Sequence, residues 1–200
     1  MKVVILCGGK GTRMPEETEF RPKPLVMIGD KPIVWHIMRL YAHFGYNEFV
    51  LCLGYKGDMI RQYFSQQHTA EPDWKIIFAD TGLECETGSR IARIKKYIGD
   101  DEYFFLTYGD GLADVDIREL EEFHKAHGKT VTMTAVQPPS PFGVIESDGN
   151  VVTGFREKPP IQHWTNGGFF VCSRRVFDEL SSDGSCVFEQ GPLPALAASS

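Results

Sequence analysis

The order of apolar and polar residues predicts alternating strands and helices along most of the chain. The apolar run at residues 3–6 indicates a short buried strand close to the first residue. Over residues 31–44 apolar side chains recur at helical spacing behind Pro32, and Gly45 supplies a stop signal. The same reasoning predicts strands at 48–53, 75–79, 103–107, 130–136 and 168–172, and helices at 57–64, 89–98, 116–127 and 174–180. We predict no regular structure for residues 195–200.

This alternation predicts an α/β fold of the Rossmann-like kind, with a mainly parallel central sheet and helices on both faces. Parallel neighbours require right-handed crossover connections, which place the helices over the sheet. Ligands of such sheets bind beyond the carboxyl ends of the strands. Two glycine-containing segments, residues 7–14 and 108–111, fall at strand ends. We therefore expect both of them at a ligand site.

The pattern changes after the proline-rich segment 138–141. Residues 143–146 and 151–155 flank Ser147-Asp148-Gly149-Asn150, a turn sequence typical of a β-hairpin. We expect a single domain with a small β-hairpin lobe, divided into a core at 1–137 and a ligand-covering part at 138–200.

Composition narrows the function classes. A chain of 200 residues with 42% hydrophobic composition can bury a sizeable core. The net charge of −6 and a pI near 5.5 argue against a nucleic-acid partner or a membrane partner, because both require a basic surface. Residues 1–31 nevertheless hold six basic and four acidic residues. We therefore predict an anion-binding corner in an otherwise acidic protein.

The cysteines indicate a reducing compartment. The five of them are widely spaced and form no C-x-x-C pair, so neither a disulfide framework nor a zinc site is predicted. The amino terminus shows no charged-then-apolar leader, and no apolar run reaches membrane-spanning length. We expect a cytoplasmic location.

The glycine-rich segment Cys7-Gly8-Gly9-Lys10-Gly11-Thr12-Arg13-Met14 favours phosphate binding. It fails the Walker pattern, because Gly11 separates Lys10 from Thr12. It also fails the dinucleotide pattern, because the third glycine would fall on Met14. Glycines still allow close approach of backbone N–H groups to a ligand, and Arg13 adds a fork for phosphate oxygens.

Together with Arg21-Pro22-Lys23-Pro24, the segment 6–13 resembles the signature of the sugar-1-phosphate nucleotidylyltransferases, L-x-G-G-x-G-T-R followed by R-P-K-P. The resemblance extends almost to the end of the chain. It is closest to the glucose-1-phosphate cytidylyltransferases, through residues 15–18, 31–38, 54–57, 80–82, 108–111, 123–128, 157–159 and 166–170. The sequence is also similar to that of cytidylyltransferases that use phosphoglutamine.

The resemblance implies that CTP is joined to a phosphorylated acceptor, and it implies a role for each residue that matches a family motif. Arg13 would hold the β- and γ-phosphates, Lys23 would lie near the α-phosphate, and Asp110 would bind Mg²⁺; these three are the expected catalytic residues. The nucleotide-binding residues implied are Leu6, Cys7, Gly8, Gly9, Lys10, Gly11, Thr12, Arg13, Lys23, Thr81, Arg90 and Gly109. The acceptor-binding residues implied are Phe142, Gly143, Glu157, Lys158, Asn166 and Gly167, within the part at 138–200.

The sequence also departs from the family pattern. Ser89 replaces a glycine, and the interval 65–79 is shorter than the family insertion used for subunit contacts, so a homo-oligomer is only one possibility. The second magnesium aspartate, expected beyond Pro192–Ala197, has no counterpart in this sequence. Asp110, phosphates and water would then hold the metal, unless the chain is shortened.

A sugar 1-phosphate is the preferred acceptor; a small non-sugar phosphate of the phosphoglutamine or phosphocholine type, and a CTP-binding module without catalysis, are the alternatives.

Overall fold

The computed structural model describes residues 1–11, 20–66 and 70–199, so Thr12 and Arg13 lie outside the described residues. The chain divides into two compact units, and each is described by itself. The first unit comprises residues 1–132 and 169–200, and the second comprises residues 133–168. The predicted division at residue 137 is functional and stays a prediction. The boundaries of the compact units fall instead within two strands of the main sheet, at 131–136 and 165–173.

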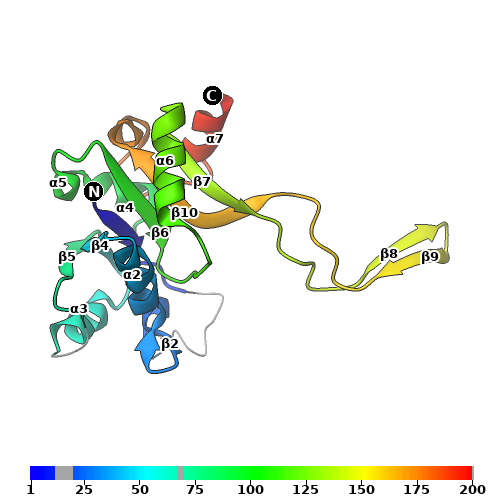
Figure 1. Ribbon diagram of the computed structural model, residues 1–200, viewed down its shortest axis with the longest axis horizontal. Coiled ribbons are helices and arrows are strands. Elements are labelled where there is room, and N and C mark those ends of the chain that lie inside the picture. Colours follow the sequence, from blue (N-terminus) through cyan, green and yellow to red (C-terminus); the bar gives the residue numbers. More distant parts are fainter. Residues whose placement is uncertain (12–19, 67–69, 200) are drawn as a thin grey trace. The chain divides into compact units, whose positions relative to one another are not determined.

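The main sheet has six strands in the order β5-β4-β1-β6-β10-β7 (Figure 1). Strand β1 pairs in parallel with β4 and β6, and β4 pairs in parallel with β5, whereas β10 runs antiparallel to β6. The strands are β1 (Val3–Leu6), β4 (Glu48–Leu53), β5 (Lys75–Asp80), β6 (Tyr103–Tyr108), β7 (Val131–Val136) and β10 (Thr165–Ser173). Chain order reverses between β1 and β6, and such switch points form the ligand crevice of doubly wound sheets.

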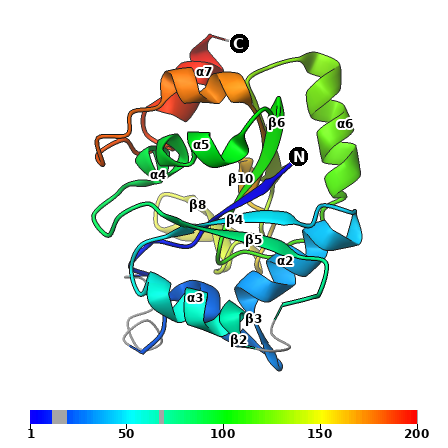
Figure 2. The same cartoon turned by 90° about the vertical axis from the view of Figure 1, so that its left-hand side faces the viewer.

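Helices cover both faces of this sheet in the first unit, as Figure 2 shows. Alternation along β1 sends Val3 and Ile5 into one core cluster and Val4 into the other. Helices α2 (Ile33–His43), α3 (Gly57–Ser65) and α6 (Ile117–His127) pack on the first cluster. The second cluster is covered by α4 (Thr87–Arg93), α5 (Lys95–Ile98), the 3-10 helix η2 (Arg174–Glu179) and α7 (Pro192–Ala198). The predicted α/β, Rossmann-like fold is confirmed.

Four predicted elements differ from the structure. The helix predicted over 31–44 begins only at Ile33, because Lys31–Pro32 form the short strand β3, which pairs with β2 (Met27–Ile28). The helix predicted at 89–98 is two helices that meet at Ile94, whose ψ of 0° ends α4. The helix predicted at 174–180 is the 3-10 helix η2. Residues 195–198, predicted to be irregular, belong to α7, which begins at Pro192 and packs Leu193 and Leu196 against the second cluster.

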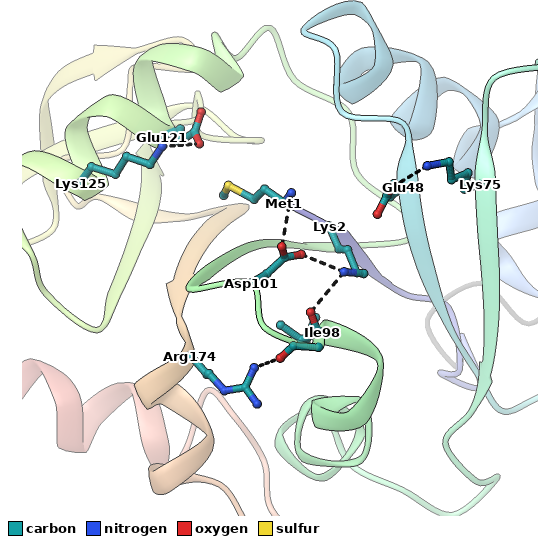
Figure 3. Close-up of polar contacts among 10 residues, drawn as sticks. Met1, Lys2, Glu48, Lys75, Ile98, Asp101, Glu121, Lys125 and Arg174 are labelled. Atoms are coloured by element: carbon teal, nitrogen blue, oxygen red, sulfur yellow. Dashed lines mark hydrogen bonds and ion pairs between the residues drawn. The ribbon is translucent and has the colours of Figure 1, made fainter.

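The start of β1 is fixed at the end of the sheet away from the glycine-rich corner. The Lys2 ammonium donates to the carbonyl of Ile98 at 3.2 Å and to the Asp101 carboxylate at 2.9 Å (Figure 3). The amino-terminal ammonium lies 3.7 Å from the same carboxylate. These contacts fix the amino-terminal end of β1, and the glycine-rich corner that begins at Cys7 follows its carboxyl end.

The second unit contains the predicted hairpin, formed by β8 (Val144–Asp148) and β9 (Val151–Arg156). Gly149 sits in the turn at a φ of +55°, a conformation that glycine adopts at little cost. Ile145 and Phe155 are paired across the strands and are both exposed within this unit. None of the helices in the described ranges is long and apolar enough to cross a membrane.

Candidate nucleotide site

A cavity of about 240 Å³ lies where β1 and β6 end, at the switch point of the sheet. It belongs entirely to the first unit. Four segments of the chain line it, and the described lining residues are Leu6, Cys7, Gly8, Gly9, Gly11, Lys23, Pro24, Cys85, Glu86, Thr87, Arg90, Tyr108, Gly109 and Asp110.

The glycine-rich corner is held by backbone hydrogen bonds to the neighbouring strand. The Cys7 N–H donates to the carbonyl of Cys52 at 3.0 Å, and the Tyr55 N–H donates to the carbonyl of Gly8 at 3.1 Å. A Cβ on Gly8 would lie 2.1 Å from the Arg90 guanidinium, and a Cβ on Gly54 would lie 2.7 Å from the Gly8 carbonyl oxygen. Glycine is therefore required at both positions, because the loop, the strand end and the arginine meet there.

Arg90 ties this corner to the loop that follows β5. Its buried guanidinium donates at 2.9 Å to the Gly8 carbonyl, at 2.8 Å to the Gly82 carbonyl and at 2.8 Å to the Thr81 hydroxyl. Longer bonds of 3.3 Å reach the carbonyls of Leu53 and Leu83. Burial lowers the pKa of this side chain from its usual range. Arg90 thus lines the cavity while most of its donors are engaged by the protein itself.

Of the implied nucleotide residues that the structure describes, Thr81 and Lys10 do not line the cavity. Thr81 is buried behind it, where its hydroxyl donates to the Leu53 carbonyl at 2.7 Å and accepts from Arg90. Lys10 is half-exposed and pairs with Glu84 at 2.6 Å. That ion pair joins the glycine-rich corner to the loop after β5, and surface pairs of this kind contribute about 0.2–1 kcal/mol.

Lys23 and Asp110 meet at the cavity although 87 residues separate them. The Lys23 ammonium lies 2.6 Å from an Asp110 carboxylate oxygen, and the two side chains are 23% and 29% exposed, so both remain accessible to a ligand. The 3-10 helix η1 (Lys23–Leu25) places the lysine, and its Leu25 is buried in the core. Gly109 permits the approach, because a Cβ there would lie 2.9 Å from the Leu6 carbonyl oxygen and 3.0 Å from Pro24.

The residues present fit a magnesium ion only if a substrate supplies most of its ligands. Within the described ranges no group of three or more His, Cys, Asp or Glu side chains could hold a metal. Asp110 supplies one accessible carboxylate in the cavity. Mg²⁺ is commonly bound by one or two carboxylates together with substrate phosphates and waters. The Asp110 carboxylate is compatible with that arrangement.

The structure brings most of the implied nucleotide residues to one cavity. Those that line it are Leu6, Cys7, Gly8, Gly9, Gly11, Lys23, Arg90, Gly109 and Asp110. The implied roles of Thr12 and Arg13 stay predictions, since both residues lie outside the described ranges. Five further lining residues, Pro24, Cys85, Glu86, Thr87 and Tyr108, were not among the residues implied at the nucleotide site. Of these, Pro24 lies within the R-P-K-P segment and Tyr108 within the segment 108–111, which is the signal that could have found them.

The implied acceptor residues all lie in the second unit. A Cβ on Gly143 would lie 2.5 Å from the Phe155 ring, and one on Gly167 would lie 2.5 Å from the Thr134 hydroxyl, so neither position has room for a side chain. Phe142 is 76% exposed within this unit. Asn166 accepts a hydrogen bond from the Gly168 N–H at 2.8 Å.

Glu157 and Lys158 are neighbours that form an ion pair, and Lys158 has a left-handed backbone conformation. The two side chains form an exposed ion pair at 4.0 Å. Lys158 has a φ of +42°, in the left-handed region, which costs a non-glycine residue about 1 kcal/mol or more. Such strain is found preferentially at functional segments.

Comparison with known proteins identifies the family. Residues 2–187 match the model of the nucleotidyl transferase family. The chain is 46% identical over 215 residues to the "Probable glucose-1-phosphate cytidylyltransferase" of Bacillus subtilis, and 44% identical over 217 residues to the glucose-1-phosphate cytidylyltransferase of Salmonella typhi. Each alignment covers 98% of this chain and 84% of the relative. The crystal structure of HddC from Yersinia pseudotuberculosis has a TM-score of 0.74 at 25% identity and covers 96% of this chain and 85% of that one.

The chain therefore belongs to the nucleotidyl transferase family, and it is an enzyme of this class. Within the family it is a sugar-1-phosphate nucleotidylyltransferase similar to the glucose-1-phosphate cytidylyltransferases. The resemblance predicted from the glycine-rich and R-P-K-P segments is confirmed.

Proposed function

We propose that this enzyme joins CTP to a sugar 1-phosphate, with glucose 1-phosphate as the first candidate, giving a CDP-sugar and pyrophosphate. The observation that carries the proposal is the meeting of Lys23 and Asp110 beside the glycine-rich corner in one cavity. The identity of 44–46% to glucose-1-phosphate cytidylyltransferases supports both the base and the acceptor.

The proposed reaction is an in-line displacement. A phosphate oxygen of the acceptor attacks the α-phosphorus of CTP and forms a new P–O bond. The bond from the α-phosphorus to the bridging oxygen breaks, its electron pair stays on that oxygen, and pyrophosphate leaves. No protein nucleophile is needed, so catalysis rests on positioning and on neutralising phosphate charge.

The described side chains have distinct roles in this proposal. The Lys23 ammonium would lie between the α-phosphate and the acceptor phosphate and reduce their mutual repulsion. The backbone of Gly8, Gly9 and Gly11 would allow the nucleotide to approach the corner closely. Arg13 is proposed to hold the β- and γ-phosphates.

Asp110 is proposed to hold Mg²⁺ with phosphate oxygens and water, and when bound this ion would neutralise charge on the triphosphate. In the structure Lys23 occupies the Asp110 carboxylate. We infer that the two side chains separate when substrate enters, so that the lysine can contact phosphate and the carboxylate can contact the metal.

The acceptor part of the proposal rests on the second unit. Phe142, Gly143, Glu157, Lys158, Asn166 and Gly167 would contact the sugar phosphate, with Lys158 toward its phosphate. The left-handed backbone of Lys158 supports a functional role for that segment. We propose a cytoplasmic location for the enzyme, where CTP and sugar phosphates are available, and possible association with further copies.

Pyrophosphate release tests this proposal. The wild-type enzyme is assayed with CTP, Mg²⁺ and one of three acceptors: glucose 1-phosphate, phosphocholine or phosphoglutamine. The assay with glucose 1-phosphate is then repeated with UTP, GTP and dTTP in place of CTP. We expect release with CTP and glucose 1-phosphate. Lys23→Ala and Asp110→Ala should each lower kcat at least about 100-fold, because each removes charge stabilisation at the reacting phosphates. Lys129→Ala, at an exposed position in the first unit, is the control.

Each other result has a definite meaning. Release only with an amino-acid phosphate or phosphocholine would replace the sugar by a non-sugar acceptor. Tight CTP binding without release for any acceptor would support a binding module without catalysis. Full activity of Asp110→Ala would overturn the metal assignment.

A further inference from the structure

Glu189 connects two parts of the cavity lining from outside it. One of its carboxylate oxygens accepts a hydrogen bond from the Tyr108 hydroxyl at 2.6 Å, and the other accepts one from the Thr87 hydroxyl at 2.6 Å. Tyr108 and Thr87 both line the cavity, whereas Glu189 does not. The bonded pairs are distant in the chain, since Tyr108 and Glu189 are 81 positions apart and Thr87 and Glu189 are 102 positions apart.

The two elements joined by Glu189 carry the chemistry of the site. Tyr108 is the last residue of β6 and directly precedes Gly109 and Asp110. Thr87 is the first residue of α4, the helix that carries Arg90. Because Arg90 in turn holds the Gly8 carbonyl, the carboxylate links the strand end beside Asp110 to the glycine-rich corner.

The segment around Glu189 is itself firmly placed. The Phe188 N–H donates to the Thr87 hydroxyl oxygen at 2.9 Å, so this hydroxyl both accepts from the segment and donates to it. Phe188 is fully buried and its ring contacts Phe170, which also contacts the Tyr108 ring. Buried Phe188 and its N–H bond to Thr87 therefore fix the chain next to Glu189, and the Glu189 carboxylate in turn holds Tyr108 and Thr87.

A carboxylate suits this position better than a neutral side chain. Two hydroxyl groups donate to it, and an ionised carboxylate offers an acceptor oxygen to each. Hydrogen bonds to charged groups are also about twice as strong as neutral ones. A glutamine would offer one carbonyl oxygen and one amide donor, so at least one of the two hydroxyls would have to turn.

We infer that Glu189 is a positioning residue of the nucleotide site, which fixes Tyr108 and Thr87 so that the cavity is formed before the nucleoside triphosphate binds. The inference rests on the proposed function, since it assigns the cavity to a nucleotide. Preorganisation of this kind acts on affinity, because a loose wall must be ordered when the ligand enters.

Binding of CTP to four variants tests the inference. Glu189→Gln and Glu189→Ala should raise the Kd for CTP and the KM for CTP about five- to tenfold, with kcat changed less than threefold. Tyr108→Phe should give a similar rise, and Glu189→Ala combined with Tyr108→Phe should be little worse than either alone, because both changes remove the same bond. Glu179→Gln, an exposed glutamate of η2, is the matched control and should bind CTP like the wild type.

A purely structural role would lower the melting temperature and leave the Kd of the folded protein unchanged. That result would overturn the inference, and so would additive effects of the Glu189 and Tyr108 changes. Failure of the proposed function is distinguishable from this. If the wild type prefers another of the four triphosphates, the same variants are compared with that nucleotide. If it binds none of them, both the proposed function and the inference fall.

Discussion

Ser89 stands where the family resemblance predicts a glycine, and its hydroxyl makes one hydrogen bond as a donor and two as an acceptor. It is buried in α4, donates to the Ser181 carbonyl at 2.8 Å and accepts from the N–H groups of Gly184 and Cys186 at 3.0 and 3.1 Å. The side chain therefore organises the turn at 181–186 that lies against the start of α4.

Replacement of Ser89 by alanine should lower the free energy of unfolding by about 2 kcal/mol, because two backbone donors lose their acceptor. Ser89→Gly should cost more, since glycine also weakens a helix by about 1 kcal/mol relative to alanine. The measurement is urea unfolding. Ser65→Ala is the control, because its hydroxyl donates only to the Arg61 carbonyl within the exposed end of α3. Equal stability of the two alanine variants would show that the 181–186 turn does not depend on Ser89.

Single residues of the candidate site could be predicted from the sequence only where they belong to a short local motif. Lys23 and Asp110 were recognisable because each sits in a short pattern, R-P-K-P and Y-G-D-G. Glu189 gave no such signal. Its importance comes from bonds across 81 and 102 residues, and such pairing is set by tertiary packing rather than by neighbours in sequence.

At the scale of elements, apolar periodicity located the strands and the long helices. It could not locate a break between two helices whose buried residues keep the same spacing across the break. Ile91, Ile94 and Ile98 are all buried at helical spacing, so the pattern continues across the end of α4. The break appears only in the backbone at Ile94. Helix α7 was missed because Leu196 is the one large apolar residue in 195–200, so no apolar periodicity could be recognised there, although Pro192 at the start of α7 is a typical helix signal.

The junction of β1, β4 and α4 should be intolerant of added volume. In Gly54→Ala the new Cβ would meet the Arg90 guanidinium at 2.5 Å and the Gly8 carbonyl oxygen at 2.7 Å, and a backbone atom cannot move aside cheaply. We expect a loss of about 3 kcal/mol in unfolding free energy together with weaker CTP binding. Gly111→Ala, where a Cβ would meet nothing within 4 Å, is the stability control and should change it by less than about 0.5 kcal/mol. A Gly54→Ala protein as stable as Gly111→Ala would mean that these elements can separate freely.

At the scale of the whole molecule, a buried histidine makes the stability of the first unit depend on pH. His124 of α6 is fully buried, and its Nδ1 lies 2.7 Å from the Thr132 hydroxyl of β7. The same hydroxyl lies 2.6 Å from Nε2 of His127, whose Nδ1 accepts from the Lys129 N–H. This network makes the Thr132 hydroxyl the donor to a neutral His124. A proton added to Nδ1 would force the hydroxyl to turn and accept, and it would place a positive charge in a fully buried site.

Burial, with the nearby charges of His127, Arg175 and Lys125, lowers the pKa of His124 from 6.5 to about 4. Because the folded pKa lies below the unfolded one, the stabilisation is fully present above pH 6.5 and is lost as the pH falls toward 4. Between pH 7 and pH 5 the loss should be about 2 kcal/mol. Carboxyl groups whose pKa is lowered, such as Glu121, affect stability chiefly at still lower pH, so this interval isolates the histidine.

Urea unfolding at pH 7 and pH 5 measures this loss in the wild type, in His124→Gln and in His43→Gln, the last at an exposed position on α2. His124→Gln should be less stable at pH 7, since it gives up the packing of the imidazole, but its stability should fall about 2 kcal/mol less between the two pH values. His43→Gln should keep the wild-type difference. If His124→Gln retains the full pH dependence, the buried imidazole is not its source, and another group must take up the proton on unfolding.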